Sequence, residues 1–274
     1  MIVYKNVLIS SLLLLLLLMF NSASAGWLLT GKYIGPDGKT YLQRYFIQDG
    51  KVKFEQYNII YTYDSKTESI ILVDPENLVY YRSKLSGLIQ DMKSYRQKQL
   101  EILLKDVPAD QQEKVRQSYL SVISSIGAPI RPIDDSLIVS RVPDSLRILG
   151  MPSEKYLISL KSRKLEELWI SPGLNVNKEF SWSKYLNFLA LVEPDIPELS
   201  FMVSASYLEL LNKGFPSRRI FIRDGYRNEV QVNKMEEKKI PEYEFYTPSL
   251  CQELNYEDWL KRDKSNDQKY DDYE

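Results

Sequence analysis

Residues 26–82 hold six short segments of strand character, each separated from the next by residues typical of turns. This run constrains the fold more than any other feature of the sequence. Asp49-Gly50 is its strongest hairpin signal, because a tight hairpin turn needs residues that tolerate a positive φ. Beside that turn, Val52 and Phe54 fall on one face of a strand and charged residues fall on the other. Connections this short join antiparallel neighbours, so the sequence predicts a meander of six strands.

After residue 82 the apolar residues recur at helical spacing. Residues 83–126 predict two helices that are broken at Val107-Pro108. Each predicted helix has an apolar stripe and a charged opposite face. We therefore expect a helical hairpin with one apolar side, inserted after the sixth strand.

The second half of the chain returns to strand patterns after a connector at residues 127–150, which contains three prolines and is expected to be irregular. Strands are expected near 155–170, two short helices near 182–191 and 201–211, and a hairpin over 218–235. In that hairpin Ile220 and Ile222 should face Val230 and Val232, and a last strand is expected over 242–246. The fold class is α+β, with about eleven antiparallel strands in one domain.

Residues 1–25 have the pattern of a signal peptide. Lys5 precedes an apolar run, and Ala23-Ser24-Ala25 fits the small-x-small cleavage site. We expect cleavage near Ala25, a periplasmic or secreted protein, and no transmembrane segment after cleavage. The mature chain is expected to form one domain over residues 26–250, followed by a polar C-terminal tail over residues 251–274.

The composition excludes several kinds of chemistry. The sequence has no histidine and one cysteine, which removes Ser-His-Asp and Cys-His sites and histidine metal ligation. A net charge of −1 argues against a nucleic-acid partner. Ser181 and Lys184 match S-x-x-K, but the companion motifs S-D-N and K-T-G of that acyltransferase class do not occur in the sequence. We expect a protein that is not an enzyme and that carries no cofactor or metal.

Four segments resemble an uncharacterised family of exported bacterial proteins: Gly26–Tyr33, Ile70–Tyr81, Glu166–Ser171 and Lys213–Pro216. That family is similar in layout to the LolA/LolB-like fold of the periplasmic lipoprotein carrier and its outer-membrane acceptor. The resemblance implies a curved antiparallel half-barrel that holds a hydrophobic cavity. It also implies that the helical hairpin over residues 83–126 covers this cavity as a lid.

The functional hypothesis is an apolar cavity between the sheet and this lid. The strand residues expected to line the cavity are Phe54, Ile59, Tyr61, Ile70, Leu72, Leu78 and Tyr80, and those expected on the lid are Leu88, Met92, Tyr119 and Ile123. Such a cavity would hold an acyl chain, a sterol-like ligand or the lipid of a lipidated partner protein. Peripheral contact with a membrane is compatible with this hypothesis.

Two other surfaces are left open. If the same residues fill a packed core, the protein is a structural or protein- or glycan-interaction module, and a row of exposed tyrosines would be its contact surface. These tyrosines are Tyr41, Tyr45, Tyr57 and Tyr63. Separately, Arg218, Arg219, Arg223 and Arg227 form either a cationic patch near lipid headgroups or a solvated strand edge. The size of the cavity separates a binder from a packed core, because packed cores leave few voids larger than a water molecule.

Overall fold

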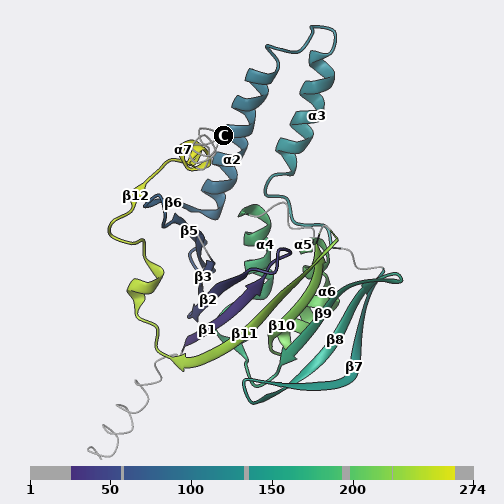
Figure 1. The fold of residues 1–274 in the computed structure, drawn as a ribbon. Coiled ribbons are helices and arrows are strands. Elements are labelled where there is room, and N and C mark those ends of the chain that lie inside the picture. The colour runs from purple at the N-terminus through teal and green to yellow at the C-terminus, as the bar shows by residue number, and fades with distance from the viewer. Residues whose placement is uncertain (1–25, 57–58, 133–135, 193–197, 224, 263–274) are drawn as a thin grey trace, which may run out of the picture.

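The computed structural model describes residues 26–56, 59–132, 136–192, 198–223 and 225–262, and the predicted signal peptide lies outside them. Within these residues, twelve strands form one sheet in the order β12-β6-β5-β4-β3-β2-β1-β11-β10-β9-β8-β7. Every pair of neighbours is antiparallel except β12 and β6. The sheet is curved and is not closed, so the α+β half-barrel is confirmed (Figure 1).

The first six strands form the predicted meander. They are β1 (Gly26–Ile34), β2 (Thr40–Gln48), β3 (Lys51–Gln56), β4 (Ile59–Asp64), β5 (Ser69–Asp74) and β6 (Val79–Lys84). Asp49 and Gly50 both have positive φ angles, as the hairpin turn between β2 and β3 requires. Each of these strands pairs with its neighbour in sequence.

The predicted helical hairpin follows β6 directly. It consists of α2 (Leu85–Leu103) and α3 (Gln112–Ser125). In Figure 1 the hairpin rises from the β6 end of the sheet, and its tip points away from the strands. Only the base of the hairpin reaches the core, where Leu88 is 1% exposed. No described helix is long and apolar enough to span a bilayer.

The second half of the chain completes the sheet and fills its concave side. Its elements are β7 (Leu137–Ile148), β8 (Met151–Leu160), β9 (Arg163–Ser171), the 3-10 helix η1 (Val176–Lys178), α4 (Trp182–Val192), α5 (Leu199–Met202), α6 (Ala205–Asn212), β10 (Phe215–Arg223) and β11 (Tyr226–Lys238). β11 pairs with β1 and so joins the two halves of the sheet. α4, α5 and α6 lie against the concave face (Figure 1). Phe188 of α4 and Tyr207 of α6 are fully buried.

The irregular connector predicted over residues 127–150 is wrong for half of its length, because residues 137–148 form β7. Proline is tolerated here because β7 is the edge strand of the sheet. Pro143 lies where the register with β8 shifts, between Val142 and Ser145. The pairing of the two strands is interrupted at a register shift, so proline, which has no backbone N–H, breaks no strand-to-strand hydrogen bond there.

The strand predicted over residues 242–246 is also wrong. Glu242–Phe245 forms the 3-10 helix η2. Phe245 and Ile240 pack with Phe46 on the convex face of the sheet, in a small cluster separate from the main core. This segment therefore covers one strand face from outside instead of extending the sheet.

The polar tail predicted from residue 251 is wrong as far as residue 262. Gln252–Glu253 forms β12, parallel to β6, and Tyr256–Lys261 forms α7. Trp259 of α7 is 4% exposed and belongs to the main core. Leu254, Tyr256 and Leu260 also pack against this core, so apolar contacts hold the segment in place. Residues 263–274 lie outside the described residues.

The hairpin of β10 and β11 has a different register from the predicted one. Ile220 lies opposite Glu229, and Arg219 lies opposite Val230. Arg219 and Phe221 therefore share the concave face with Val230 and Val232. Ile222 points to the other side and is 42% exposed. This register brings a charged side chain to the inside of the half-barrel.

Candidate ligand-binding cavity

A cavity of about 370 Å³ lies between the concave face of the sheet and the helices that cover it. Its floor comes from β1 to β4 and from β10 and β11, and its roof comes from α4, α5 and α6. On the roof, α4 contributes Trp182, Tyr185, Leu186 and Leu189. This volume is within the range of about 300–1,000 Å³ that small-molecule sites occupy.

The floor is shaped by cross-strand pairing and by one glycine. Tyr45, Phe54 and Tyr61 stand opposite one another on β2, β3 and β4. The ring centroids of Tyr45 and Phe54 are 4.8 Å apart, which gives the floor a rigid aromatic surface. Gly31 lies at a bulge of β1, where a Cβ atom would come within 2.6 Å of the Gln231 carbonyl oxygen. The close approach of β11 therefore requires glycine at this position.

The structure brings two of the seven predicted strand residues to the cavity, Phe54 and Tyr61. Ile59, Ile70 and Leu72 lie in the core beside the cavity and do not line it. Ile70 is fully buried and Leu72 is 5% exposed. These three residues support the floor rather than form its surface.

The predicted inward orientation of Leu78 and Tyr80 is wrong. Leu78 lies in the turn before β6 with a φ of 53° and is 50% exposed. Because β6 begins at Val79, Tyr81 stands opposite Leu72 on the inner face. Tyr80 lies on the other face, and its hydroxyl donates to Glu253 Oε2 at 2.7 Å. A one-residue offset in a strand exchanges its two faces.

The four predicted lid residues do not line this cavity. Leu88 is in the core, and Ile123 is 9% exposed within the hairpin. Met92 lines a different apolar pocket of about 460 Å³ between the hairpin base and α4. Tyr119 is half-buried on α3. The cover of the cavity is formed by α4, α5 and α6, which sequence reasoning had not assigned to the site.

A buried ion pair lies at the cavity wall. Arg219 lines the cavity, and its Nε donates to Glu166 Oε1 at 2.6 Å. The Tyr207 hydroxyl donates to Glu166 Oε2 at 3.0 Å. Burial raises the pKa of Tyr207 well above its usual range. Burial opposes the charge of Arg219, but the Glu166 carboxylate outweighs it and raises the arginine pKa. Arg219 and Glu166 are therefore both charged, and their charges offset each other.

Two buried polar atoms at the cavity lack hydrogen-bond partners among the described residues. They are Gln43 Oε1 and Trp182 Nε1. The other end of the Gln43 amide is used, since its Nε2 donates to Gln56 Oε1 at 2.7 Å. Unpaired buried polar groups are rare in proteins. No sequence pattern identifies them, because both depend on long-range packing.

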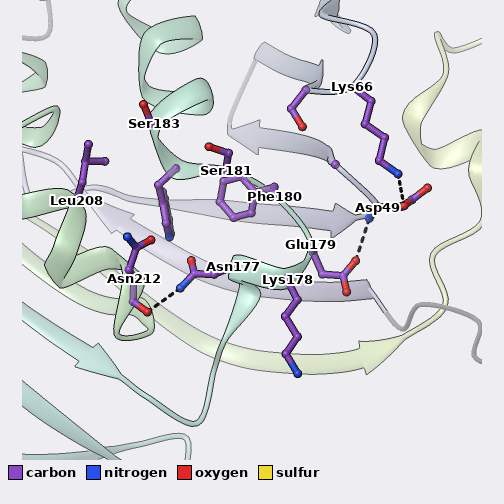
Figure 2. A pocket seen from close by; sticks show the side chains of 13 residues that line it. Asp49, Lys66, Asn177, Lys178, Glu179, Phe180, Ser181, Ser183, Leu208 and Asn212 are labelled. Atoms are coloured by element: carbon purple, nitrogen blue, oxygen red, sulfur yellow. Dashed lines mark hydrogen bonds and ion pairs between the residues drawn. The ribbon is translucent and has the colours of Figure 1, made fainter. Parts of the chain in front are cut away.

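A second, polar pocket of about 490 Å³ lies beside the N-terminus of α4 and shares Trp182 with the cavity. Figure 2 shows Ser181 and Ser183 near its upper edge and Asn177 and Asn212 below. Asn177 Nδ2 donates to the Asn212 carbonyl oxygen at 2.9 Å. Lys66 Nζ pairs with the Asp49 carboxylate, and the backbone amide of Asp49 donates to Glu179 Oε2 at 2.9 Å (Figure 2).

The S-x-x-K match does not form an acyltransferase pair. Lys184 Nζ donates to the carbonyl oxygen of Ser65 at 2.9 Å. Ser181 Oγ accepts a long contact of 3.5 Å from the Lys184 backbone amide. The lysine ammonium is therefore bound to the main chain of another strand connection, and the serine lies at the start of α4.

The arginines and tyrosines predicted to form contact surfaces make other contacts in the structure. Arg218 and Arg227 both pair with Glu229, so this carboxylate offsets part of the charge of the predicted cationic patch. The side chain of Arg223 and the whole of Tyr57 lie outside the part of the chain that the structure describes. Tyr63 is 2% exposed, Tyr45 lines the cavity and Tyr41 is half-buried. The described tyrosines therefore do not form an exposed row.

No family model matches the chain, and no curated protein matches it. Among solved structures, an uncharacterized conserved protein from Thermus thermophilus is 9% identical with a TM-score of 0.42, over 85% of this chain and 91% of that one. The Pseudomonas aeruginosa MucA/MucB complex contains a chain that is 13% identical with a TM-score of 0.38, over 84% of this chain and 58% of that one.

PNGF-II is 9% identical with a TM-score of 0.37. The match covers 87% of this chain, but the chain spans only 32% of PNGF-II. Likenesses of this size assign the chain to no family. The functional conclusion therefore depends on the geometry of the cavity.

Proposed function

We propose that this protein binds a hydrophobic ligand in the cavity between the sheet and α4 to α6. The ligand is a lipid or the acyl chain of a lipidated partner, which present the same chemistry to the cavity. The observation that carries this proposal is a cavity of about 370 Å³ with a mostly aromatic and aliphatic lining. A role as a packed structural module is the alternative, and a void of this size argues against it.

The energetics favour binding over an empty core. Each methylene group of a ligand that leaves water contributes about 0.8 kcal/mol. The aromatic floor is already ordered by contacts such as that of Phe54 with Tyr61, whose centroids are 6.4 Å apart. A preformed site loses little side-chain entropy on binding, so more of the burial energy remains as affinity.

The place of action in this proposal is the periplasm or the exterior of the cell. It rests on the signal-peptide pattern at residues 1–25. The protein acts there without catalysis, because the buried charged groups at the cavity are engaged with one another. Arg219, Glu166 and Tyr207 form one closed set of hydrogen bonds.

A fluorescence titration with pyrene tests the proposal, because pyrene is a hydrocarbon whose emission reports an apolar environment. We expect saturable binding to the wild-type protein. Leu189→Phe puts extra volume into the cavity and should weaken binding about tenfold or more. Leu191→Phe is the matched control, since Leu191 is on the same helix but lines the pocket beside the hairpin.

Equal affinities of the wild type and both variants would place pyrene elsewhere and remove the proposal. Loss of binding in Leu191→Phe alone would move the site to the hairpin pocket. Mass spectrometry of organic extracts and of co-purified proteins then separates a free lipid from a lipidated partner.

A further inference from the structure

A second apolar pocket, of about 460 Å³, lies where the base of the helical hairpin meets α4 (Figure 1). α2 lines it with Leu85, Ile89 and Met92, which recur at helical spacing, and α3 adds Val122 and Ile126. No described residue lines both this pocket and the main cavity, because α4 turns a different face to each. The hairpin pocket is therefore a separate space, and the proposed function gives it no role.

The apolar lining of the hairpin pocket is incompletely covered. Val122 is 53% exposed, and Leu85, Ile89 and Met92 are half-buried. Apolar surface that converges from three helices and remains in contact with water gains free energy when an apolar molecule covers it. Between Leu85 and Arg96, which both line the pocket, α2 rises by about 16 Å. The lining therefore suits an elongated apolar group.

The pocket has one charged residue in its lining. Among the described residues that line it, Arg96 is the only ionisable one, and it follows Met92 by one helical turn. Arg96 is exposed and makes no ion pair with the described carboxylates. The main cavity differs in this respect, because its Arg219 is already paired with Glu166. An apolar space with an unpaired cation at its solvent side is complementary to an apolar molecule with one anionic group.

We infer that the hairpin pocket binds an elongated amphiphile with one anionic headgroup, such as a fatty acid. Its chain lies against Leu85, Ile89 and Met92, and its headgroup contacts Arg96. A guanidinium suits this role because it stays charged and presents paired donors to a carboxylate. The inference goes beyond the proposed function, because it concerns another pocket and does not depend on what the main cavity binds.

Two fluorescent probes that differ by one sulfonate test the inference. Anilinonaphthalene sulfonate is an apolar ring system with one anionic group, and phenylnaphthylamine is the same ring system without it. Arg96→Gln should weaken binding of the sulfonate about threefold to fivefold, which is the size of an exposed ion pair, and leave binding of the neutral probe unchanged. Lys93→Gln is the matched control, because it removes the same charge from α2 at a residue that does not line the pocket.

Substitutions on α4 locate the sulfonate probe. Leu191→Phe puts extra volume into the hairpin pocket and should weaken its binding, whereas Leu189→Phe alters only the main cavity and should not. Equal affinities of the wild type and Arg96→Gln would overturn the inference, and so would equal losses in Arg96→Gln and Lys93→Gln. A loss in Leu189→Phe alone would place the sulfonate in the main cavity and also overturn it. A lack of pyrene binding would overturn the proposed function instead.

Competition against the bound sulfonate tests the ligand class. Dodecanoate and dodecanol have chains of equal length, and only dodecanoate is anionic at neutral pH. We expect dodecanoate to displace the sulfonate from the wild type at a concentration several-fold below that of dodecanol, and this difference should disappear in Arg96→Gln. Equal displacement by the two ligands from the wild type would overturn the inference.

Discussion

Arg219 of β10 and Glu166 of β9 form an ion pair at 2.6 Å on the concave side of the sheet, and the carboxylate is fully buried. The second oxygen of Glu166 accepts from Tyr207 of α6. This one carboxylate therefore links two strands to a helix that roofs the cavity. A buried charge is tolerated only with such partners, so the fold and the neutral character of the cavity depend on the same contact.

Removing the charge of Glu166 should strongly destabilise the protein. Glu166→Gln leaves Arg219 as an uncompensated buried cation, and breaking a buried pair in this way costs about 3–5 kcal/mol. Urea denaturation followed by far-ultraviolet circular dichroism measures the loss as a lower midpoint with an unchanged slope.

Glu167 is the control, because it is next in sequence and points to the opposite face. It pairs with Lys155 and Lys164, and its side chain is 20% exposed. Glu167→Gln should cost about 1 kcal/mol or less. Similar losses for the two variants would contradict the role given to the Glu166 contact.

The features that could be predicted from the sequence are those set by local chemistry. The turn at Asp49-Gly50 and the six-strand meander follow from short connections, and the hairpin after β6 follows from helical periodicity. Adjacent residues in a strand face opposite sides, and Glu166 and Glu167 accordingly form their ion pairs on opposite faces of β9. None of these features requires knowledge of distant contacts.

The cavity could be predicted only in part because register depends on where a strand begins. β6 starts at Val79, so Tyr81 takes the inner position that the pattern gave to Tyr80. The register of β10 likewise puts Arg219 inside in place of Ile220. The roof was missed because α4 to α6 meet the sheet only through long-range packing, as in the stacked pair of Phe188 and Tyr63 at 4.9 Å.

The strained conformation of Leu78 leads to a stability prediction. A branched residue at a φ of 53° costs about 1–2 kcal/mol, and Leu78 is 50% exposed, so little packing offsets this cost. Leu78→Gly removes the strain but increases the entropy of the unfolded chain. We expect a net gain of up to about 1 kcal/mol in thermal or urea denaturation. A loss would show that Leu78 makes packing contacts that its exposure does not indicate.

Acid should loosen the C-terminal helix α7 before it unfolds the sheet. Hydrogen bonds from Lys261 and Lys98 lower the pKa of Glu257 to about 2, from an ordinary value of 4.5. A carboxylate with a lowered pKa stabilises the folded state above pH 4.5, and this contribution is lost as pH falls from about 4.5 to about 2. The protection factors of residues 252–262, which correct the exchange rates for their intrinsic pH dependence, should therefore fall in that interval.

Glu257→Gln should remove this pH dependence and give faster exchange already at neutral pH. High salt should act in the same direction in the wild type, because the pair is exposed and is screened. Protection factors that do not depend on pH or salt would mean that α7 is held by its apolar contacts, those of Trp259, Tyr256 and Leu260 with the core.

The helical hairpin should contribute to stability without contributing to the cavity. Met92 and Tyr119 lie on α2 and α3, and neither lines the space beneath α4 to α6. Replacing a fully packed methionine by alanine lowers the free energy of unfolding by about 2–5 kcal/mol. Met92→Ala should cost less than this, because Met92 is half-buried. Tyr119→Ala should likewise cost less than the loss of a fully packed aromatic side chain, because Tyr119 is half-buried too. Both variants should bind pyrene within about twofold of the wild type, because neither substitution changes the cavity wall. A folded variant of either kind that has lost pyrene binding would make the hairpin the lid of the site, as its place after β6 first suggested.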